Sequence, residues 1–94
     1  MSVRPFYLHS TCLAIIEMKP GSLLPEHKHL HEQISYVLEG DVEATVGTSS
    51  KTLHPGDVYS VKSNTSHSCR ALGQPVRIVV ASSPLLRDYI FGEE

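Results

Sequence analysis

Turn-forming residues interrupt this sequence roughly every ten residues, and this spacing limits the possible folds more than any other feature. Glycine and proline punctuate the chain most strongly, because they favour turns over the interiors of regular elements. No stripe of apolar residues recurs at helical spacing between the turns. The turn and loop signals fall at residues 19–21, 39–41, 47–50, 54–57 and 63–66. The sequence therefore predicts an all-β protein.

The apolar runs between these turns are typical of short strands. Residues 42–46 show this most clearly, since Val42, Ala44 and Val46 alternate with polar side chains, as in a strand with one buried face. The other expected strands include 12–18, 34–38, 58–61 and 76–80, while 85–94 fit a strand, an edge extension or one helical turn. Seven or eight strands at such spacing predict a sandwich or a small barrel, and periodicity alone does not choose between them.

The bulk composition narrows the class of protein. Ninety-four residues correspond to a single domain, residues 1–94, and a net charge of −2 gives no reason to expect nucleic acid or an anionic membrane as partner. No apolar run approaches the ~20 residues of a membrane span, and the N-terminus lacks a signal peptide, so we expect the cytoplasm. Cys12 and Cys69 form no CxxC pair, which argues against a thiolate zinc site. Two reduced, buried thiols are expected, although the sequence leaves a disulfide open.

Three of the six histidines occupy alternate positions in PEHKHLHEQISYVLEG, residues 25–40. His27, His29 and Gln33 share the parity of one strand face. A straight strand over these residues would span about 20 Å, too far for side chains at both ends to reach one ion at ~2.0–2.2 Å. If they share an ion, the backbone bends between His29 and Gln33, and His31 at the bend is expected at the rim or in solvent. Taken alone, neighbouring strand histidines are more often exposed or hydrogen-bonded than metal-bound.

A longer pattern contains these residues. The spacing G-x5-H-x-H-x3-Q-x6-G runs over residues 21–40, and a second segment, residues 56–67, follows after a 15-residue interval. Here the sequence resembles the cupin superfamily. Its first motif matches at every position except Gln33, which replaces a glutamate, and its second matches at the glycine and at His67. Asn64 stands at a glycine position of that motif, and Asn tolerates positive φ better than most residues.

The resemblance implies an antiparallel jelly-roll β-barrel, the RmlC-like cupin fold, with one metal ion in its mouth. The family's four metal ligands correspond to His27, His29, Gln33 and His67. Three imidazoles and an amide carry no charge, so a bound dication would keep its full charge and attract an anionic substrate. Imidazole suits Zn, Ni, Fe, Cu and Mn alike, so the sequence does not identify the divalent transition metal. Glu26 and Glu32 flank the ligand positions and are candidates for orienting an imidazole.

The HEQ form of the motif, followed by YVLEG, looks similar to small single-domain cupins of the KdgF type, which act in pectin and alginate breakdown. The resemblance extends to residues 82–89, and it implies conversion of unsaturated uronates to the linear keto sugar. The carboxylate and aromatic residue that usually precede this ending are missing, since residues 79–82 read Val-Val-Ala-Ser. Arg87 is a candidate catalytic residue that meets a substrate carboxylate, or else a surface arginine in an ion pair. Tyr36 is a second candidate, lining the pocket or lying in the core.

Three functions stay open at this point. The first is a metal-dependent enzyme on a small anionic, sugar-derived substrate, with uronate ketonisation or related isomerase or lyase chemistry. The second is a module that binds a metal or small ligand without turnover, favoured by the missing carboxylate and the short chain. The third is an Fe-dependent dioxygenase. Exposed sheet edges, and the frequent pairing of cupins, also predict a homodimer with the N-terminal strand at the interface.

Overall fold

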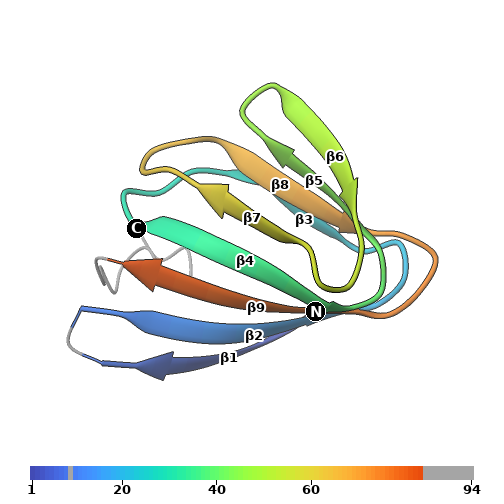
Figure 1. Ribbon diagram of the computed structural model, residues 1–94, viewed down its shortest axis with the longest axis horizontal. Coiled ribbons are helices and arrows are strands. Elements are labelled where there is room, and N and C mark those ends of the chain that lie inside the picture. The colour runs from blue at the N-terminus through green and yellow to red at the C-terminus, as the bar shows by residue number, and fades with distance from the viewer. Residues whose placement is uncertain (9, 84–94) are drawn as a thin grey trace.

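Nine strands in two facing antiparallel sheets make up the part of the chain that the computed structural model describes, residues 1–8 and 10–83 (Figure 1). They are β1 (Ser2–Tyr7), β2 (Cys12–Met18), β3 (Leu23–His27), β4 (Glu32–Glu39), β5 (Val42–Val46), β6 (Ser49–Leu53), β7 (Val58–Val61), β8 (His67–Ala71) and β9 (Val76–Ser83). One sheet has the order β1-β2-β9-β4-β7, and the other has the order β3-β8-β5-β6. The chain crosses repeatedly between the sheets, which is the jelly-roll arrangement that the family resemblance implied.

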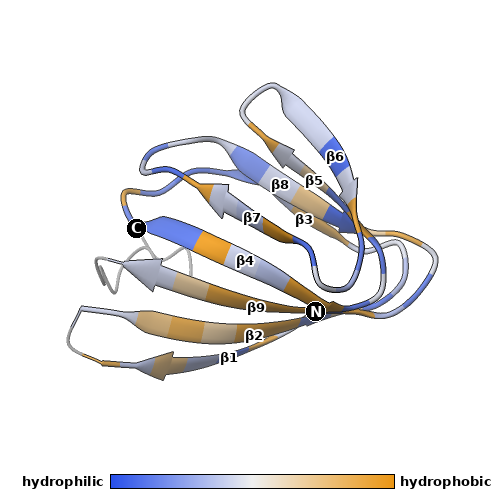
Figure 2. Ribbon diagram, in the orientation of Figure 1, coloured by the Kyte–Doolittle hydropathy of each residue, from blue (hydrophilic) through white to orange (hydrophobic). Residues whose placement is uncertain are grey.

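The core lies between the inner faces of the two sheets. Side chains alternate along each strand, so β9 buries Val76, Ile78 and Val80 while their neighbours point outward. Hydrophobic residues colour most of β2 and β9, the two strands that pair inside the larger sheet (Figure 2). The rest of the main cluster comes from both sheets: Met18, Val37, Val42, Ala44, Leu53, Cys69 and Ala71. This cluster holds the sheets together and leaves the histidine-bearing ends of β3 and β8 to form a pocket.

Strand boundaries follow the expectation where the residues are apolar and depart from it where they are polar. The expected strands 12–18 and 58–61 match β2 and β7. The loop expected at 47–50 is longer than the loop in the structure. Only Gly47 and Thr48 turn, and Ser49 already pairs with Val46 as β6 begins. The prediction was wrong there because a hairpin strand is held by backbone hydrogen bonds. These bonds do not depend on apolar side chains, so the polar sequence SSKTL gives no sign of the strand.

Two prolines lie inside strands, and both strands are edges. Pro5 is in β1 and Pro25 is in β3, the first strands of the two sheet orders. An edge position tolerates a residue without an N–H group, because no second neighbour needs that donor. In the described residues no helix is long and apolar enough to cross a membrane.

Candidate metal centre

The ends of three segments converge at one end of the sandwich. A register irregularity between Leu24 and His27 lets β3 place His27 directly opposite His67, the first residue of β8. The chain then leaves the smaller sheet, and it enters the larger one when β4 begins at Glu32. His29 lies on this crossing, so the bend that the sequence required between His29 and Gln33 is confirmed.

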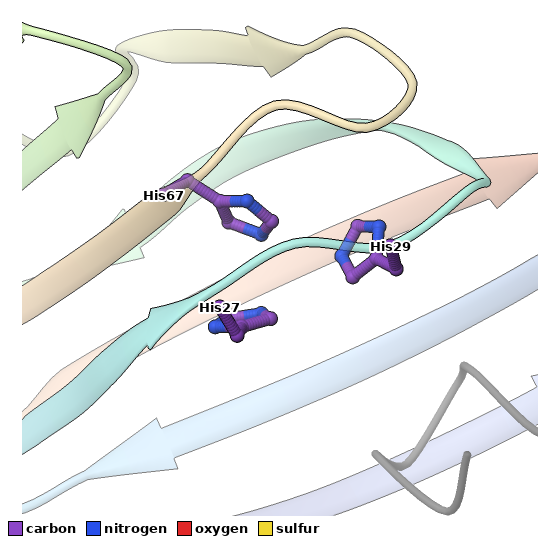
Figure 3. Close-up of side chains that lie close together, drawn as sticks. All are labelled: His27, His29 and His67. Carbon is purple, nitrogen blue, oxygen red and sulfur yellow. The ribbon is translucent and has the colours of Figure 1, made fainter.

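The imidazoles of His27, His29 and His67 face one another (Figure 3). Their candidate ligand atoms all lie within 4.8 Å of one another. That limit is close to the separation of two nitrogen ligands on one ion, at most about 4.2 Å for bonds of about 2.1 Å. The ring centroids of His27 and His67 are 4.1 Å apart, and those of His29 and His67 are 4.7 Å apart. Two segments far apart in sequence thus supply one compact set of nitrogen donors.

The backbone fixes which nitrogen each ring presents. In each ring Nδ1 lies within hydrogen-bonding distance of a backbone carbonyl two residues away. The acceptors are Pro25 for His27 at 2.8 Å, His31 for His29 at 2.9 Å and Thr65 for His67 at 2.9 Å. A carbonyl only accepts, so Nδ1 carries the proton and the lone pair of Nε2 is free for a metal. Nε2 of His67 is buried without any hydrogen-bond partner, and a metal ion would satisfy it.

The carboxylates that were candidates for orienting these rings do not do so. Glu26 accepts a hydrogen bond from the hydroxyl of Ser66, and Glu32 is exposed. The expectation was wrong because backbone carbonyls already occupy every Nδ1 position.

Burial favours the neutral forms of His67 and His29. It lowers the pKa of His67 to about 4, against the opposing effect of the Thr65 carbonyl, and the neighbouring imidazoles of His27 and His29 lower it further. Burial also lowers the pKa of His29, while hydrogen bonds with the His31 backbone and the Gln33 side chain raise it in part. Neutral imidazole is the form that binds a metal, so His67 and His29 need not lose a proton to do so at neutral pH.

His31 lies inside the pocket, not at its rim. Its side chain is only 3% exposed, and its ring stacks on that of His29 with centroids 3.7 Å apart and planes 9° from parallel. Its Nδ1 has no hydrogen-bond partner, and burial lowers its pKa to about 4. The expectation that His31 is solvated was wrong because the crossing turns this side chain toward the interior. The contact restricts the orientation of the His29 ring.

Gln33 approaches the imidazoles from the larger sheet. It is half-buried on β4, next to Ser82 of β9 and Val61 of β7. Its hydrogen bond with the side chain of His29 raises the pKa of that imidazole, which places the amide beside His29. Its Nε2 donates to Ser35 Oγ at 3.2 Å. The four side chains expected as ligands therefore come from three strands and one crossing, and all four line the same pocket.

A second loop holds the crossing in place. The N–H of Asn64 donates to the carbonyl of His29 at 2.7 Å, and Ser63 donates to the carbonyl of Leu30. Asn64 has a φ of 61°, so the expectation that it replaces a glycine at positive φ is confirmed. This left-handed residue aims its N–H at the segment that carries a ligand.

The converging side chains line a cavity of about 380 Å³. Apolar side chains from both sheets form most of its wall, including Cys12, Ala14, Ile16, Leu24 and Val80. His31, Gln33, Ser82 and Tyr59 add polar groups. Cys12 and Cys69 also line it as free, buried thiols, which confirms the expected reduced state. Burial raises the pKa of both thiols.

Of the two candidate catalytic residues, Tyr36 lies in the described part of the chain and Arg87 does not. Tyr36 is 41% exposed on the outer face of β4, so both its expected places, the pocket and the core, were wrong. It has the opposite parity to Gln33 and Val37, which point inward. Arg87 lies outside the described residues. Tyr59, which the sequence did not single out, is the tyrosine that lines the cavity in the described chain.

The donor set fits a divalent transition metal. Three imidazole nitrogens with fixed tautomers and one amide oxygen suit such ions, and four protein ligands leave one or two positions open in a five- or six-coordinate ion. A bound ion would supply Lewis-acid polarisation of a substrate oxygen.

Comparisons with known proteins agree with this geometry. Residues 14–82 match the family model described as a cupin domain. KdgF from a Halomonas species superposes with a TM-score of 0.86 at 23% identity, over 94% of this chain and 82% of that chain, a likeness of fold. An RmlC-like cupin from Shewanella frigidimarina gives 0.86 at 25% identity, over 94% and 79%. TT1209 from Thermus thermophilus gives 0.84 at 25% identity, over 89% and 83%. No curated protein matches the sequence significantly.

Proposed function

Because this chain belongs to the cupin domain family, we propose that it is a metal-dependent enzyme acting on a small anionic, sugar-derived substrate. The observation that carries the proposal is the convergence of three Nε2 atoms, from His27, His29 and His67, beside a largely apolar cavity. The reaction we favour is conversion of an unsaturated uronate to its linear keto form, or related isomerase or lyase chemistry. This conversion is an isomerisation, so it needs no oxidant, reductant or co-reactant.

The charge of the site favours an anion. All four proposed ligands are neutral, so a Zn, Ni, Mn or Fe dication would keep its charge, and a substrate carboxylate or enolate would offset it. Among the described residues that line the cavity, Glu26 is the one that carries a carboxylate. It is already bonded to Ser66, at the exposed side of the pocket. The apolar wall would limit water around the bound substrate and strengthen this attraction.

The size of the cavity supports a small substrate. About 380 Å³ is near the lower end of the volumes that hold small ligands. Arg87 remains our candidate partner for the substrate carboxylate. No carboxylate stands at residues 79–82, so the enzyme would move protons through solvent or through a group contributed by another part of the pocket.

The test is to follow the ultraviolet absorbance of an unsaturated uronate, which disappears as its double bond is lost. Metal-loaded protein should accelerate this loss above the spontaneous rate, and both chelation and His67→Ala should abolish the acceleration. His54→Ala is the matched control, since His54 is an exposed histidine paired with Asp41 at 2.9 Å. Activity that survives complete removal of metal would contradict the proposal.

A non-catalytic binding module is the second candidate, and the absence of a carboxylate at residues 79–82 favours it. Uronates that bind with unchanged absorbance would select this function. The third candidate, an Fe-dependent dioxygenase, would reveal itself by oxygen uptake with Fe(II) and a diol or thiol substrate.

We also propose that the protein works in the cytoplasm. Cys12 and Cys69 are both free thiols, as is usual in a reducing compartment.

A further inference from the structure

The side-chain amide of Gln33 can turn either of two ends toward the imidazoles, and only one can bind a metal. Oε1 has lone pairs, whereas the NH2 group is a donor without one to offer. A flipped amide would direct N–H groups at a dication. The metal centre therefore needs a device that distinguishes the two ends.

Ser35 lies in the position to do this. It is two residues beyond Gln33 on β4, on the same inner face, and is 0% exposed. Gln33 Nε2 donates to Ser35 Oγ at 3.2 Å, which commits the nitrogen end of the amide to the core side. The amide oxygen is thereby left for the side where the histidines converge.

Tyr59 lies next to Ser35 and hydrogen-bonds with it. Ser35 and Tyr59 are register partners across β4 and β7, so their side chains are direct neighbours on the inner face. Hydrogen bonds with Ser35 and with Cys69 shift the pKa of Tyr59 in opposite directions. Burial raises the Tyr59 pKa more strongly than either, so the phenol keeps its proton to donate. Ser35 has a single hydroxyl hydrogen, so its oxygen can only accept from Gln33 when that hydrogen is given to Tyr59.

We propose that Ser35 and Tyr59 are positioning residues, which hold the Gln33 amide with its nitrogen toward the core and Oε1 toward the three imidazoles. The hydrogen bonds run in one direction, from Gln33 through Ser35 and Tyr59 to Cys69. Such a series polarises the amide and makes its oxygen a better donor to a metal. This inference rests on the metal-binding part of the proposed function and is independent of the reaction.

The first test compares two serines on the same face. Ser35→Ala should weaken the affinity of the metal-free protein for Zn²⁺ or Co²⁺ by roughly tenfold or more, a usual loss when a group that orients a ligand is removed. Ser82→Ala is the matched control: Ser82 is buried, lines the cavity and lies opposite Gln33, but its side chain makes no hydrogen bond within the described part of the chain. It should change the affinity less than about threefold. Competition with a chromophoric chelator measures both.

A tyrosine pair gives a second test that leaves Ser35 unaltered. Tyr59→Phe should weaken metal binding severalfold, because Ser35 is then free to donate to the amide oxygen and compete with the metal. Tyr36→Phe removes the same hydroxyl from the outer face and should have no effect. The visible spectrum of the Co²⁺-loaded protein should change in Ser35→Ala and Tyr59→Phe, since loss of an oxygen ligand alters the coordination.

A double-mutant cycle separates positioning from general destabilisation. In a Gln33→Ala background, Ser35→Ala should cost no further affinity, because the amide it orients is gone. Equal losses in Ser35→Ala and Ser82→Ala, or the same Ser35→Ala loss with and without Gln33, would overturn the inference. Metal binding without uronate turnover would count against the proposed reaction alone, whereas a wild-type chain that binds no metal would overturn both.

Discussion

At the residue scale, the metal centre is encoded mainly by backbone carbonyls. Pro25, His31 and Thr65 each offer a carbonyl two residues from a histidine, and each fixes Nδ1 of that ring. Metal-binding histidines often rely on a carboxylate for this purpose. Here the orientation follows from the local chain path, so it is insensitive to substitutions of neighbouring acidic residues such as Glu26.

Replacing His31 tests the neutrality of the pocket. The pKa of His31 and of His67 is lowered to about 4 by burial, and that of His29 is also lowered. Between the ordinary value of about 6.5 and about 4, the unfolded chain therefore binds more protons than the folded one, so stability of the metal-free protein is complete above this window and falls within it. His31→Phe removes one such group while a flat ring can still stack on His29.

We therefore expect His31→Phe to lose less stability than wild type between about pH 7 and about pH 4.5, measured by urea unfolding with chelator present. His54→Phe is the control. Asp41 raises the pKa of His54, so the His54–Asp41 pair stabilises the protein at low pH. His54→Phe should therefore lose at least as much stability as wild type when the pH falls. Identical pH dependence in wild type and His31→Phe would contradict this account of the pocket.

The ligands could be predicted from sequence, but their surroundings could not. The spacing of residues 21–40 indicated His27, His29 and Gln33, and chain geometry required a bend between them. His31 could not be placed, because parity has no meaning at a bend. Tyr36 was placed wrongly although the signal existed: it shares parity with Ile34 and not with Gln33. Tyr59 depends on its pairing with Ser35, a register between strands that a single sequence does not reveal.

At the scale of elements, the turn between β4 and β5 sets how closely the strand ends pack. Gly40 has a φ of +78°, and a Cβ built there would lie 2.2 Å from the carbonyl oxygen of Pro75. Gly21 has the same φ with nothing within 4 Å, and Gly73 has neither constraint. These three glycines therefore separate the cost of backbone conformation from the cost of a clash.

We expect Gly40→Ala to destabilise the protein by roughly 2–4 kcal/mol, Gly21→Ala by about 1 kcal/mol and Gly73→Ala by less than about 0.5 kcal/mol. Thermal or urea unfolding of the metal-free variants gives the order. Because β4 carries Gln33, Gly40→Ala should also weaken metal binding more than Gly21→Ala does. A Gly40→Ala variant as stable as Gly73→Ala would contradict the close approach of Gly40 to the Pro75 carbonyl.

Which elements could be predicted depended on their side chains. β2 and β7 were found to the residue, since apolar runs end there at clear turn signals. β3, β6 and β8 were not, because β3 contains a proline, β6 is polar, and β8 begins with a ligand histidine in place of an apolar residue. The prediction of an all-β protein was correct despite these errors, because it depends on the turn spacing alone.

At the scale of the whole molecule, the outer face of the larger sheet carries apolar side chains where solvent would favour polar ones. Register pairs align Phe6, Leu13, Ala81 and Ile34 in one row across four strands. Tyr36 and Val58 pair in the next row. We call the exposed members the outer apolar face, and they are Phe6, Leu13, Ile34, Tyr36 and Val58. Contiguous exposed apolar surface of this kind marks an interaction site.

The charges beside this face suit a second copy of the chain. Glu17 pairs with Arg4 at 3.9 Å and with Arg77 at 3.1 Å, and Arg77 also pairs with Glu39 at 3.8 Å. Opposite charges therefore alternate across the strands, and these four groups carry no net charge that would repel a copy related by a two-fold axis. Pro5 lacks an N–H group on the free edge of β1, which disfavours pairing through that edge. We therefore expect a homodimer that uses the outer apolar face, with β1 contributing Phe6.

Light scattering at micromolar concentration should give twice the mass of the chain, and Ile34→Glu or Val58→Glu should give the monomer. Leu23→Glu, an exposed leucine on the smaller sheet, should remain dimeric. A monomeric wild-type protein would contradict this prediction and leave the metal centre unaffected.

The central claim is that His27, His29 and His67 hold one divalent ion together. Calorimetric titration of the metal-free full chain with Zn²⁺ tests this most directly, with Ni²⁺ and Mn²⁺ as further probes. We predict one ion per chain, abolished binding in His67→Ala, and unchanged binding in His54→Ala, which removes an exposed histidine outside the cluster. Binding by His67→Ala with wild-type stoichiometry and affinity would show that the three histidines do not form the metal centre.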